Sequence, residues 1–390
     1  LSDTFDIFKH KPIYVTQSDV KGKFTLTNLK PGKYHIYAFS DKNRNLTTDP
    51  KTEAYAFLSN PIQLNENIDT ITLRLVRLDT RPLKLTSARP YNSYYNIKTT
   101  KQLIHYNLAA TDRNLIHSFG EDNTIIKLYN TFPDDSLLVR LTAIDSAQNQ
   151  IDTTVYAKFL TRKSTPEKFT IQQKRTALSL SNASLETQIS YSKPIVHINY
   201  DSILLKLDSA NTLSLTPTDI KIDSINKTLT IIRKINRSHL EPTTTPTTNT
   251  KPAAPAHQLY YGYGAFVSIE NDSSKAWTEN LKLLTPENTG VILIKVQTKT
   301  DNFIIQLKDK AFNTLRTAKN IKEIRWDDLP PGDYQIIFIN DTNRDGKWSP
   351  GNKLKNEEPE EVIYHQNEKK NTTITLKANW ELGPLLINYP

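Results

Sequence analysis

The sequence predicts an all-β protein: tandem β-sandwich domains, immunoglobulin-like and transthyretin-like, in an elongated chain. Three observations carry this prediction. Short apolar segments alternate with polar residues, Asn, Asp, Ser and Pro-Gly turns separate them, and one motif occurs twice, 300 positions apart. The two copies read Leu29-Lys30-Pro31-Gly32-Lys33-Tyr34-His35-Ile36 and Leu329-Pro330-Pro331-Gly332-Asp333-Tyr334-Gln335-Ile336. Such a repeat indicates a duplicated module.

Each copy predicts strand, tight turn, strand, polar loop and strand. Pro fixes φ and Gly supplies positive φ in the Pro-Gly turn. Tyr34, Ile36 and Ala38 alternate with polar or outward-facing residues, which is typical of a half-buried strand. We expect strands over 24–26 and 69–73, and we expect residues 24–79 and 290–380 to share one sandwich topology.

Four domains are predicted from this pattern. They are a transthyretin-like module at 1–79, an immunoglobulin-like sandwich at 80–165, a second immunoglobulin-like domain at 166–285 and a second transthyretin-like module at 286–390. The first module is expected to be incomplete, because the segments Val291–Val296 and Phe303–Leu307 that precede the second copy have no room before the first. A low-complexity Thr/Pro-rich stretch at 242–256 predicts a mobile loop within the third domain.

Composition argues against several function classes. The chain has 390 residues with no Cys and no Met, so a thiol nucleophile, a disulfide and a thiolate metal site are excluded. Its net charge of +9 is scattered without a dense basic run, which argues against nucleic-acid binding. The sequence contains no nucleophile elbow, phosphate loop or zinc-binding helix motif, so we expect no enzyme activity.

Two further segments carry a family resemblance. Gln188-Ile189-Ser190-Tyr191-Ser192-Lys193-Pro194-Ile195 resembles the opening strand of bacterial SbsA-type immunoglobulin-like domains, and Gly264-Ala265-Phe266-Val267-Ser268-Ile269-Glu270-Asn271-Asp272 resembles their last strand. With the Leu-x-Pro-Gly-x-Tyr module and Ala378-Asn379-Trp380 near the end, the chain resembles a family of Bacteroidota lipoproteins with immunoglobulin-like domains. The module also resembles transthyretin-like and collagen-binding B-type modules. The resemblance implies an exported protein held at the outer membrane by a lipid that lies outside this chain.

The leading functional hypothesis is a non-enzymatic scaffold or accessory interaction subunit of an outer-membrane complex for assembly, secretion or uptake. Its expected partners are other outer-membrane or surface proteins, and its expected place is the cell surface or the periplasmic face. A carbohydrate- or adhesin-type binding module is the alternative, since tyrosines cluster at Tyr91, Tyr94, Tyr95 and at Tyr260, Tyr261, Tyr263. A hydrolase with a site between domains is the second alternative, and it requires paired carboxylates in a deep pocket.

One motif has the spacing of a calcium loop. Asp341, Asn343 and Asp345 place side-chain oxygens at positions 1, 3 and 5, Gly346 follows at position 6, and Lys347 could add its carbonyl. Position 12 lacks the bidentate Glu of a full loop. The alternative is a polar turn closed by Asx hydrogen bonds. Ca²⁺ is the single candidate cofactor.

A tripeptide of Asp, then Ser or Thr, then a small or apolar residue occurs seven times. It resembles the O-glycosylation signal of exported Bacteroidota proteins, and glycans belong on exposed turns. The other interpretation is that Asp-Ser/Thr begins strands in β-proteins. The candidate acceptors are Thr70, Ser136, Ser146, Thr153, Ser202, Ser209 and Ser224.

Overall fold

The computed structural model describes residues 5–132, 134–160, 165–208, 211–241 and 257–390. We name four segments: the first module (5–79), the second domain (80–165), the third domain (166–285) and the last module (286–390). Strands form nearly all of their regular structure, which confirms the all-β prediction. The Thr/Pro-rich stretch at 242–256 lies outside the described residues, as does Ser209.

The first module contains two small sheets. One pairs β1 with β4 and the other pairs β2 with β3, all antiparallel. The expected strands at 24–26 and 69–73 are absent. The partner of β1 comes earlier because Ile62-Gln63-Leu64 offers the same Ile-x-Leu pattern as Ile71-Thr72-Leu73 after a shorter connection. The strands are β1 (Gly32–Tyr34), β2 (Tyr37–Phe39), β3 (Tyr55–Phe57) and β4 (Ile62–Leu64).

The second domain is a sandwich of two antiparallel sheets, in the orders β5-β6-β9-β8 and β11-β10-β7. Alternation drives the packing: in β10, Val139, Leu141 and Ala143 point into the core, and the residues between them do not. The strands are β5 (Leu85–Tyr91), β6 (Tyr94–Thr99), β7 (Leu103–Ala109), β8 (Ile116–Phe119), β9 (Ile125–Tyr129), β10 (Ser136–Asp145) and β11 (Gln150–Lys158).

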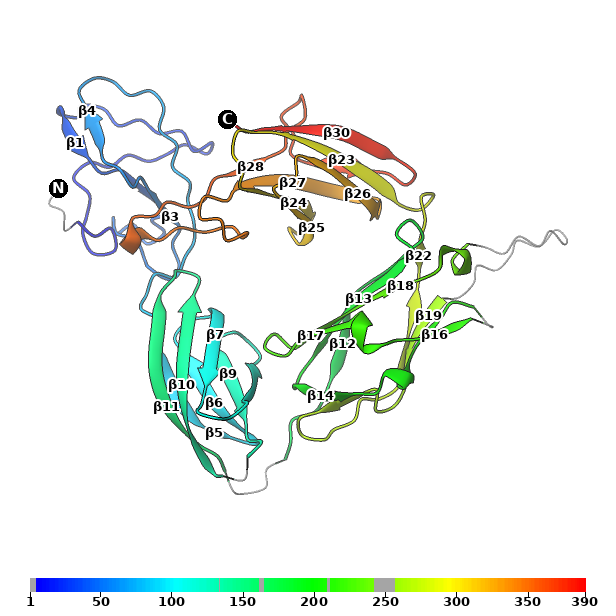
Figure 1. Cartoon of the computed structure of the whole chain (residues 1–390). Coiled ribbons are helices and arrows are strands. Elements are labelled where there is room, and N and C mark those ends of the chain that lie inside the picture. Colours follow the sequence, from blue (N-terminus) through cyan, green and yellow to red (C-terminus); the bar gives the residue numbers. More distant parts are fainter. Residues whose placement is uncertain (1–4, 133, 161–164, 209–210, 242–256) are drawn as a thin grey trace.

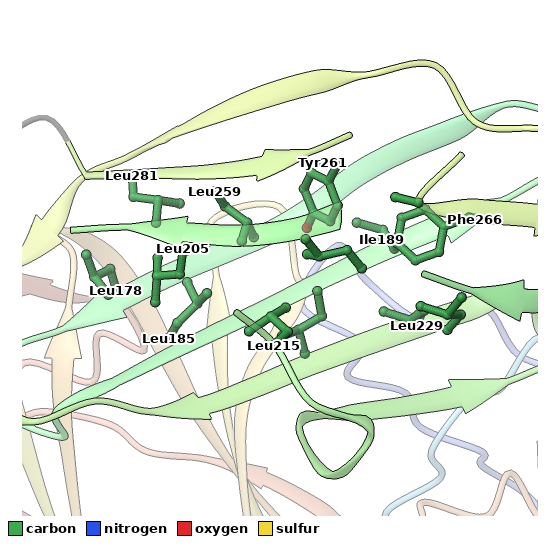
Figure 2. Packing of buried hydrophobic residues seen from close by; sticks show 14 of the residues in the cluster. Leu178, Leu185, Ile189, Leu205, Leu215, Leu229, Leu259, Tyr261, Phe266 and Leu281 are labelled. Atoms are coloured by element: carbon green, nitrogen blue, oxygen red, sulfur yellow. The ribbon is translucent and has the colours of Figure 1, made fainter. Parts of the chain in front are cut away.

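The third domain has the largest core. Its sheets run β17-β18-β13-β12-β22, β16-β15-β19-β21 and β14-β20. Figure 2 shows the side chains that fill the space between strands of this domain, among them Leu185, Leu259 and Phe266. The elements are β12 (Ile171–Ser179), β13 (Ser184–Tyr191), β14 (Ile195–Ile198), η1 (Tyr200–Ser202), β15 (Ile203–Lys206), β16 (Thr212–Ser214), η2 (Pro217–Asp219), β17 (Ile220–Asp223), β18 (Thr228–Lys234), η3 (Arg237–His239), β19 (His257–Tyr261), β20 (Phe266–Ser268), β21 (Trp277–Leu281) and β22 (Leu283–Leu284).

The last module is a two-layer sandwich. One sheet runs β26-β23-β30, and the other runs β25-β24-β27-β28, with β29 also paired to β27. The inward residues of both sheets form one core, which includes Ile294, Phe303 and Phe338. The elements are β23 (Gly290–Gln297), β24 (Phe303–Asp309), β25 (Thr314–Lys319), β26 (Glu323–Leu329), β27 (Gly332–Asn340), η4 (Lys353–Lys355), β28 (Val362–Tyr364), β29 (Ile374–Leu376) and β30 (Glu381–Asn388).

The four segments do not follow one another in a straight rod. Each segment contacts the next, and the last module also contacts the first. The four segments therefore form a closed ring (Figure 1). The expected elongated arrangement is therefore corrected. Sequence reasoning could not foresee the return, because it depends on a few polar contacts between modules about 300 residues apart.

Helices contribute little to this fold. Those in the described ranges are four short 3₁₀ turns, η1 to η4. In that part of the chain no helix has the length and apolar character required to cross a bilayer.

Candidate functional sites in the repeated loops and at the domain junctions

The predicted calcium loop follows β27 and is closed by its own side chains. Asp341 is buried, and its two carboxylate oxygens accept the N–H groups of Asp345 at 3.1 Å and of Gly346 at 2.9 Å. The side chain of Asn343 also accepts from Asp345, and the carboxylate of Asp345 accepts the N–H of Lys347 at 2.7 Å. These are Asx turns, in which side-chain oxygens replace the backbone acceptors of a turn.

The loop after β2 in the first module has the same hydrogen bonds. Asp41 accepts the N–H groups of Asn45 at 2.9 Å and Leu46 at 3.0 Å, and Asn45 accepts the N–H of Thr47 at 2.7 Å. Asn45 stands where the second copy has Asp345, and Leu46 stands where it has Gly346. The fold of the loop therefore requires neither the second carboxylate nor the glycine.

A buried glutamate anchors each loop, and sequence reasoning missed both. The carboxylate of Glu360 accepts the N–H of Thr342 at 2.7 Å and that of Ser349 at 2.8 Å. Glu53 is only 2% exposed and accepts at 2.7 and 2.8 Å from the residues at the equivalent positions, Lys42 and Asp49. The offset between the glutamates is 307 and not 300, so the repeat alone did not align them. In each module the glutamate lies two residues before a strand, β28 (Val362–Tyr364) after Glu360 and β3 (Tyr55–Phe57) after Glu53. This shared position was the signal in the sequence that could have identified the two anchors.

These contacts limit what the second loop offers a cation. Its two loop carboxylates already accept backbone N–H groups, although each carboxylate has further acceptor positions. Among the described residues, no group of three or more His, Asp or Glu side chains is placed to hold a metal ion. The candidate ligands are all oxygen atoms, which suit a hard cation such as Ca²⁺, but the loop supplies few of them. Calcium binding therefore stays a prediction.

The tyrosine clusters are mainly packed inside the sandwiches. Tyr94, Tyr95 and Tyr261 are buried, and burial raises their pKa values above that of a free phenol. Tyr261 stacks on Trp277 with ring centroids 4.0 Å apart. Tyr260 is half-buried, and Tyr91 and Tyr263 are exposed. Two exposed tyrosines in different domains do not form a stacking platform.

The candidate glycan acceptors differ in accessibility. Thr70, Ser146 and Ser224 are exposed, whereas Ser136, Thr153 and Ser202 are half-buried. The hydroxyl of Ser136 accepts a hydrogen bond from Tyr156. Ser146 follows a buried aspartate, Asp145, that pairs with Lys101. Accessibility therefore favours the first three, and modification of any of them stays a prediction.

A polar network without a sequence signature joins the second and third domains. Glu167 accepts from the hydroxyl of Tyr94 at 2.7 Å and pairs with Lys127 at 2.6 Å. The ammonium of Lys127 also lies 4.4 Å from the centroid of the Tyr94 ring. Burial acts to raise the pKa of Glu167, but the bonds from Lys127 and Tyr94 outweigh it and lower the pKa.

Lys193, inside the SbsA-like segment, extends this network. Its side chain is 1% exposed and pairs with both Glu270 and Asp272 of the other SbsA-like segment. Burial acts to lower the pKa of Lys193, and the two carboxylates reverse that effect and raise it. Ser93 of the second domain donates to Glu270, which links the pair to the neighbouring domain.

Lys227 makes a second link between the same two domains. Its ammonium donates to the carbonyl oxygens of Phe119 and Gly120, each at 2.6 Å. Burial, followed by the charge of Lys127, lowers the pKa of Lys227 to about 8. The half-buried Lys227 thus binds backbone carbonyls of the adjacent domain.

The first and last modules meet in a contact that we call the clasp. The carboxylate of Glu358 accepts from both the N–H and the hydroxyl of Ser59, each at 2.7 Å. Asn356 donates to the carbonyl of Ser59 at 2.7 Å, and Arg74 pairs with Glu361. Nothing in the sequence pattern indicated this contact.

The segment after the last loop also reaches the second domain. The ammonium of Lys353 lies 4.7 Å from the ring centroid of Phe57 and 5.3 Å from that of Tyr37, and burial lowers its pKa. Asn352 donates to the carbonyl of Ala147 at 2.6 Å. The residues around η4 therefore touch two other segments.

Two cavities in the described residues lack a catalytic constellation. The larger, of about 390 Å³, is lined by Asp112, Arg113, Asn114, Thr131 and Phe132. The other, of about 200 Å³, contains one carboxylate, Glu186, and that group faces Arg175. Neither contains paired carboxylates of the kind a glycosidase uses.

Comparison with known proteins adds little to these observations. No protein-family model matches the chain, and no curated protein matches it. Among solved structures, dimeric latent PorU from Porphyromonas gingivalis is 11% identical over 70% of this chain and 34% of its own, with a TM-score of 0.26. The chain thus spans about a third of PorU.

Two other solved structures align over more of their own length. The glucan-utilization protein SGBP-B from Bacteroides ovatus is 9% identical over 78% of this chain and 82% of its own, with a TM-score of 0.18. The titin fragment I67–I69 is 10% identical over 66% and 93%, with a TM-score of 0.16. At these values the similarities carry no argument about function.

Proposed function

We propose that this chain is a non-enzymatic interaction subunit, a scaffold or accessory protein, of a larger assembly at the outer membrane of a Bacteroidota cell. One observation carries the proposal: the buried lysines of the middle domains, Lys101, Lys127 and Lys193, lie at junctions between segments and not around a cavity. Lys193 and Lys127 are almost fully buried, and their carboxylate partners come from, or lead into, another domain.

Burial of a charged group is unfavourable, so the places where the fold buries and pairs charges indicate which contacts matter to it. An ionic group removed from water costs several kcal/mol unless it is paired. Here such pairs fix the orientation of one sandwich against the next. A chain that fixes the geometry of its domains, and has small cavities in its described part, is suited to holding other proteins at set positions.

The proposal places the chain at the cell surface or on the periplasmic face, with a lipid anchor outside it and other envelope proteins as partners. The carbohydrate- or adhesin-type alternative needs an exposed aromatic platform, and only Tyr91 and Tyr263 of the six clustered tyrosines are well exposed. The hydrolase alternative needs paired carboxylates in a pocket. No observation favours either alternative over an interaction role.

Affinity purification from detergent-solubilised outer membranes tests this role. The tagged protein is expected to retain one or a few envelope proteins in stoichiometric amounts. The matched variants are Arg74→Glu, which breaks the clasp pair, and Arg74→Glu with Glu361→Arg, which restores it with reversed charges. A partner that requires the closed arrangement is lost with the single variant and recovered with the double variant.

Two results would overturn the proposal. One is the absence of any stoichiometric protein together with retention on immobilised glycans, which would favour the carbohydrate-binding alternative. The other is turnover of a glycan or peptide substrate by the purified chain, which would favour the hydrolase.

A further inference from the structure

The first module has a strand edge that is filled in its duplicate. In the last module, β27 pairs with β28 and β29 on one side and with β24 on the other. The equivalent strands of the first module, β1 and β2, pair only with β4 and β3 among the described residues. Within residues 5–39, all of which are described, no backbone hydrogen bond fills the β24 side.

Backbone direction shows which groups face the empty side. The N–H of Ser40 bonds to Ala54, and the carbonyl of Ile36 accepts from Leu58, so the even-numbered residues face β3. Because successive residues of a strand point their N–H and C=O groups to opposite sides, those of His35, Tyr37 and Phe39 face the open edge. The odd-numbered residues of β27 face β24 in the same way.

The face beside this edge is covered less than in the duplicate. Tyr334, Ile336 and Phe338 are buried in the core of the last module. Their counterparts Tyr34, Ile36 and Ala38 are only half-buried.

The neighbouring residues of the first module are more exposed still. Ile13 is 70% and Val15 is 47% exposed, and Tyr14 contacts the ring of Tyr34 with centroids 6.1 Å apart. Clustered exposed apolar side chains of this kind mark an interaction surface.

We infer that the open edge of β1 and β2 accepts a β-strand from a partner polypeptide, which adds to the sheet antiparallel to residues 34–40. Strand addition of this kind takes its affinity from main-chain hydrogen bonds and its specificity from alternate side chains. The inference rests on the proposed interaction role and names how the partner binds.

The duplicate defines the chemistry of the added strand. In β24, Phe303, Ile305 and Leu307 point into the sandwich core, and Phe303 lies opposite Asn340 while Asp309 lies opposite Tyr334. The partner strand is therefore about seven residues long, with large apolar residues at alternate positions on the face that covers Ile36. Ala38, smaller than its counterpart Phe338, leaves space for those side chains.

The natural probe is the protein's own β24 sequence. A fluorescent peptide of residues 301–311 is titrated with the full chain, and binding is followed by fluorescence anisotropy. The control peptide carries an N-methyl group on the amide of Gln306, because the even-numbered amides of β24 face β27. N-methylation removes one hydrogen bond and leaves every side chain unchanged, so binding should weaken about tenfold.

Two protein variants complete the test. Ile36→Glu puts a charge on the face that the peptide covers and should abolish binding. Lys51→Glu, in the exposed loop beyond the end of β2, should leave it unchanged. Hydrogen–deuterium exchange on the peptide-bound wild-type protein should show new protection at residues 35–39, a readout that does not depend on any variant folding.

Several results would overturn the inference. They are no binding of the peptide, equal binding of the N-methylated peptide, and a dimer in sedimentation experiments that the peptide dissociates, which would make a second copy the occupant. Loss of peptide binding in a longer form of the chain would assign the edge to a strand of the same polypeptide. If the peptide fails but membrane purification still yields a partner, the interaction role stands and this edge is not its site.

Discussion

The first and last modules of this chain share their turns and loops but differ in how they bury the two faces of the repeated strands: the last module buries both faces of β27, and the first packs mainly one face of β2. In the last module the face of Tyr334, Ile336 and Phe338 is the core. In the first module the opposite face, that of Tyr37 and Phe39, packs against Tyr55 and Phe57 of the same module and against Ala147 of the second domain. Loop structure is thus local, whereas the choice of core face depends on which strands are present.

The residues at equivalent positions agree with this difference. Ile337 and Ile339, which form a small buried cluster with Ile304, correspond to the larger Tyr37 and Phe39 of the first module. Phe338, in the main core of the last module, corresponds to the smaller Ala38. The larger side chains of the first module thus lie on the face that packs against Phe57 and Ala147, which is the expected result of packing requirements.

The turns and polar loops of the two modules have the same hydrogen bonds although the strands beside them are packed differently. The phenol of Tyr34 donates to the carbonyl of Lys30, as Tyr334 donates to Pro330. Glu53 and Glu360 anchor the polar loops alike. These bonds span 4 to 18 residues and stay within one module, so they do not require the strands that the described part of the first module lacks.

The largest expected contrast is between two isoleucines. Ile336→Ala removes a fully buried side chain and should lower the free energy of unfolding of the last module by about 2–5 kcal/mol. Ile36→Ala, on the less covered face, should cost about 1 kcal/mol or less. Native-state hydrogen exchange measures both within the intact chain, because it reports each module separately. Equal losses would mean that the first module has a complete core.

The anchoring glutamates should give similar effects in both modules. Glu53→Gln and Glu360→Gln each replace a carboxylate oxygen by an NH₂ group that faces a backbone N–H, at a cost of about 1–3 kcal/mol. Exchange of the loop amides over 40–54 and 340–361 reports the loss. A large effect in only one module would show that the two loops are not equivalent.

The clasp should contribute less. Arg74→Glu breaks a partly exposed ion pair whose free energy is about 0–1 kcal/mol. Because the chain has no native Cys, spin labels at Glu66→Cys and Lys369→Cys report the distance between the modules, which should increase and broaden. Arg44→Glu is the control, an exposed charge reversal in the same module. An unchanged distance would show that the remaining contacts hold the clasp alone.

Calcium should have the smallest effect. At a free concentration equal to its dissociation constant, a ligand stabilises a fold by only about 0.4 kcal/mol. We expect calcium to raise the melting temperature slightly, and Asp345→Asn, which keeps an acceptor for the N–H of Lys347, to remove that increase while leaving the temperature in chelator unchanged. In the first module Asn45 already lacks the carboxylate, so Asn45→Ala should show no calcium dependence. Identical melting curves in calcium and chelator for the unmutated protein would contradict the site.

Local patterns were read correctly from the sequence. The apolar segments Val291–Val296 and Phe303–Leu307 located β23 and β24, and the repeat located the paired loops. The strand expected at 24–26 failed for a nonlocal reason: its counterpart β26 is held by pairing with β23, and the described part of the first module has no equivalent of β23. A strand requires a partner that alternation alone does not supply.

The candidate sites were less predictable. Ligand spacing identified Asp341, Asn343 and Asp345, but the anchor Glu360 lies 15 residues beyond Asp345 and is outside every loop motif. The junction residues Lys127 and Glu167 follow no spacing rule, because they meet only when the second and third domains dock. Burial of a lysine is visible only in three dimensions.

The clasp has a consequence for the outline of the molecule. Both of its halves belong to one chain, so closure is intramolecular and proceeds at an effective concentration in the millimolar range. Contacts too weak to join two separate molecules are then sufficient to keep the ends together much of the time. Opening requires no domain to unfold. Because Arg74 and Glu361 are partly exposed, we expect high ionic strength to weaken the clasp.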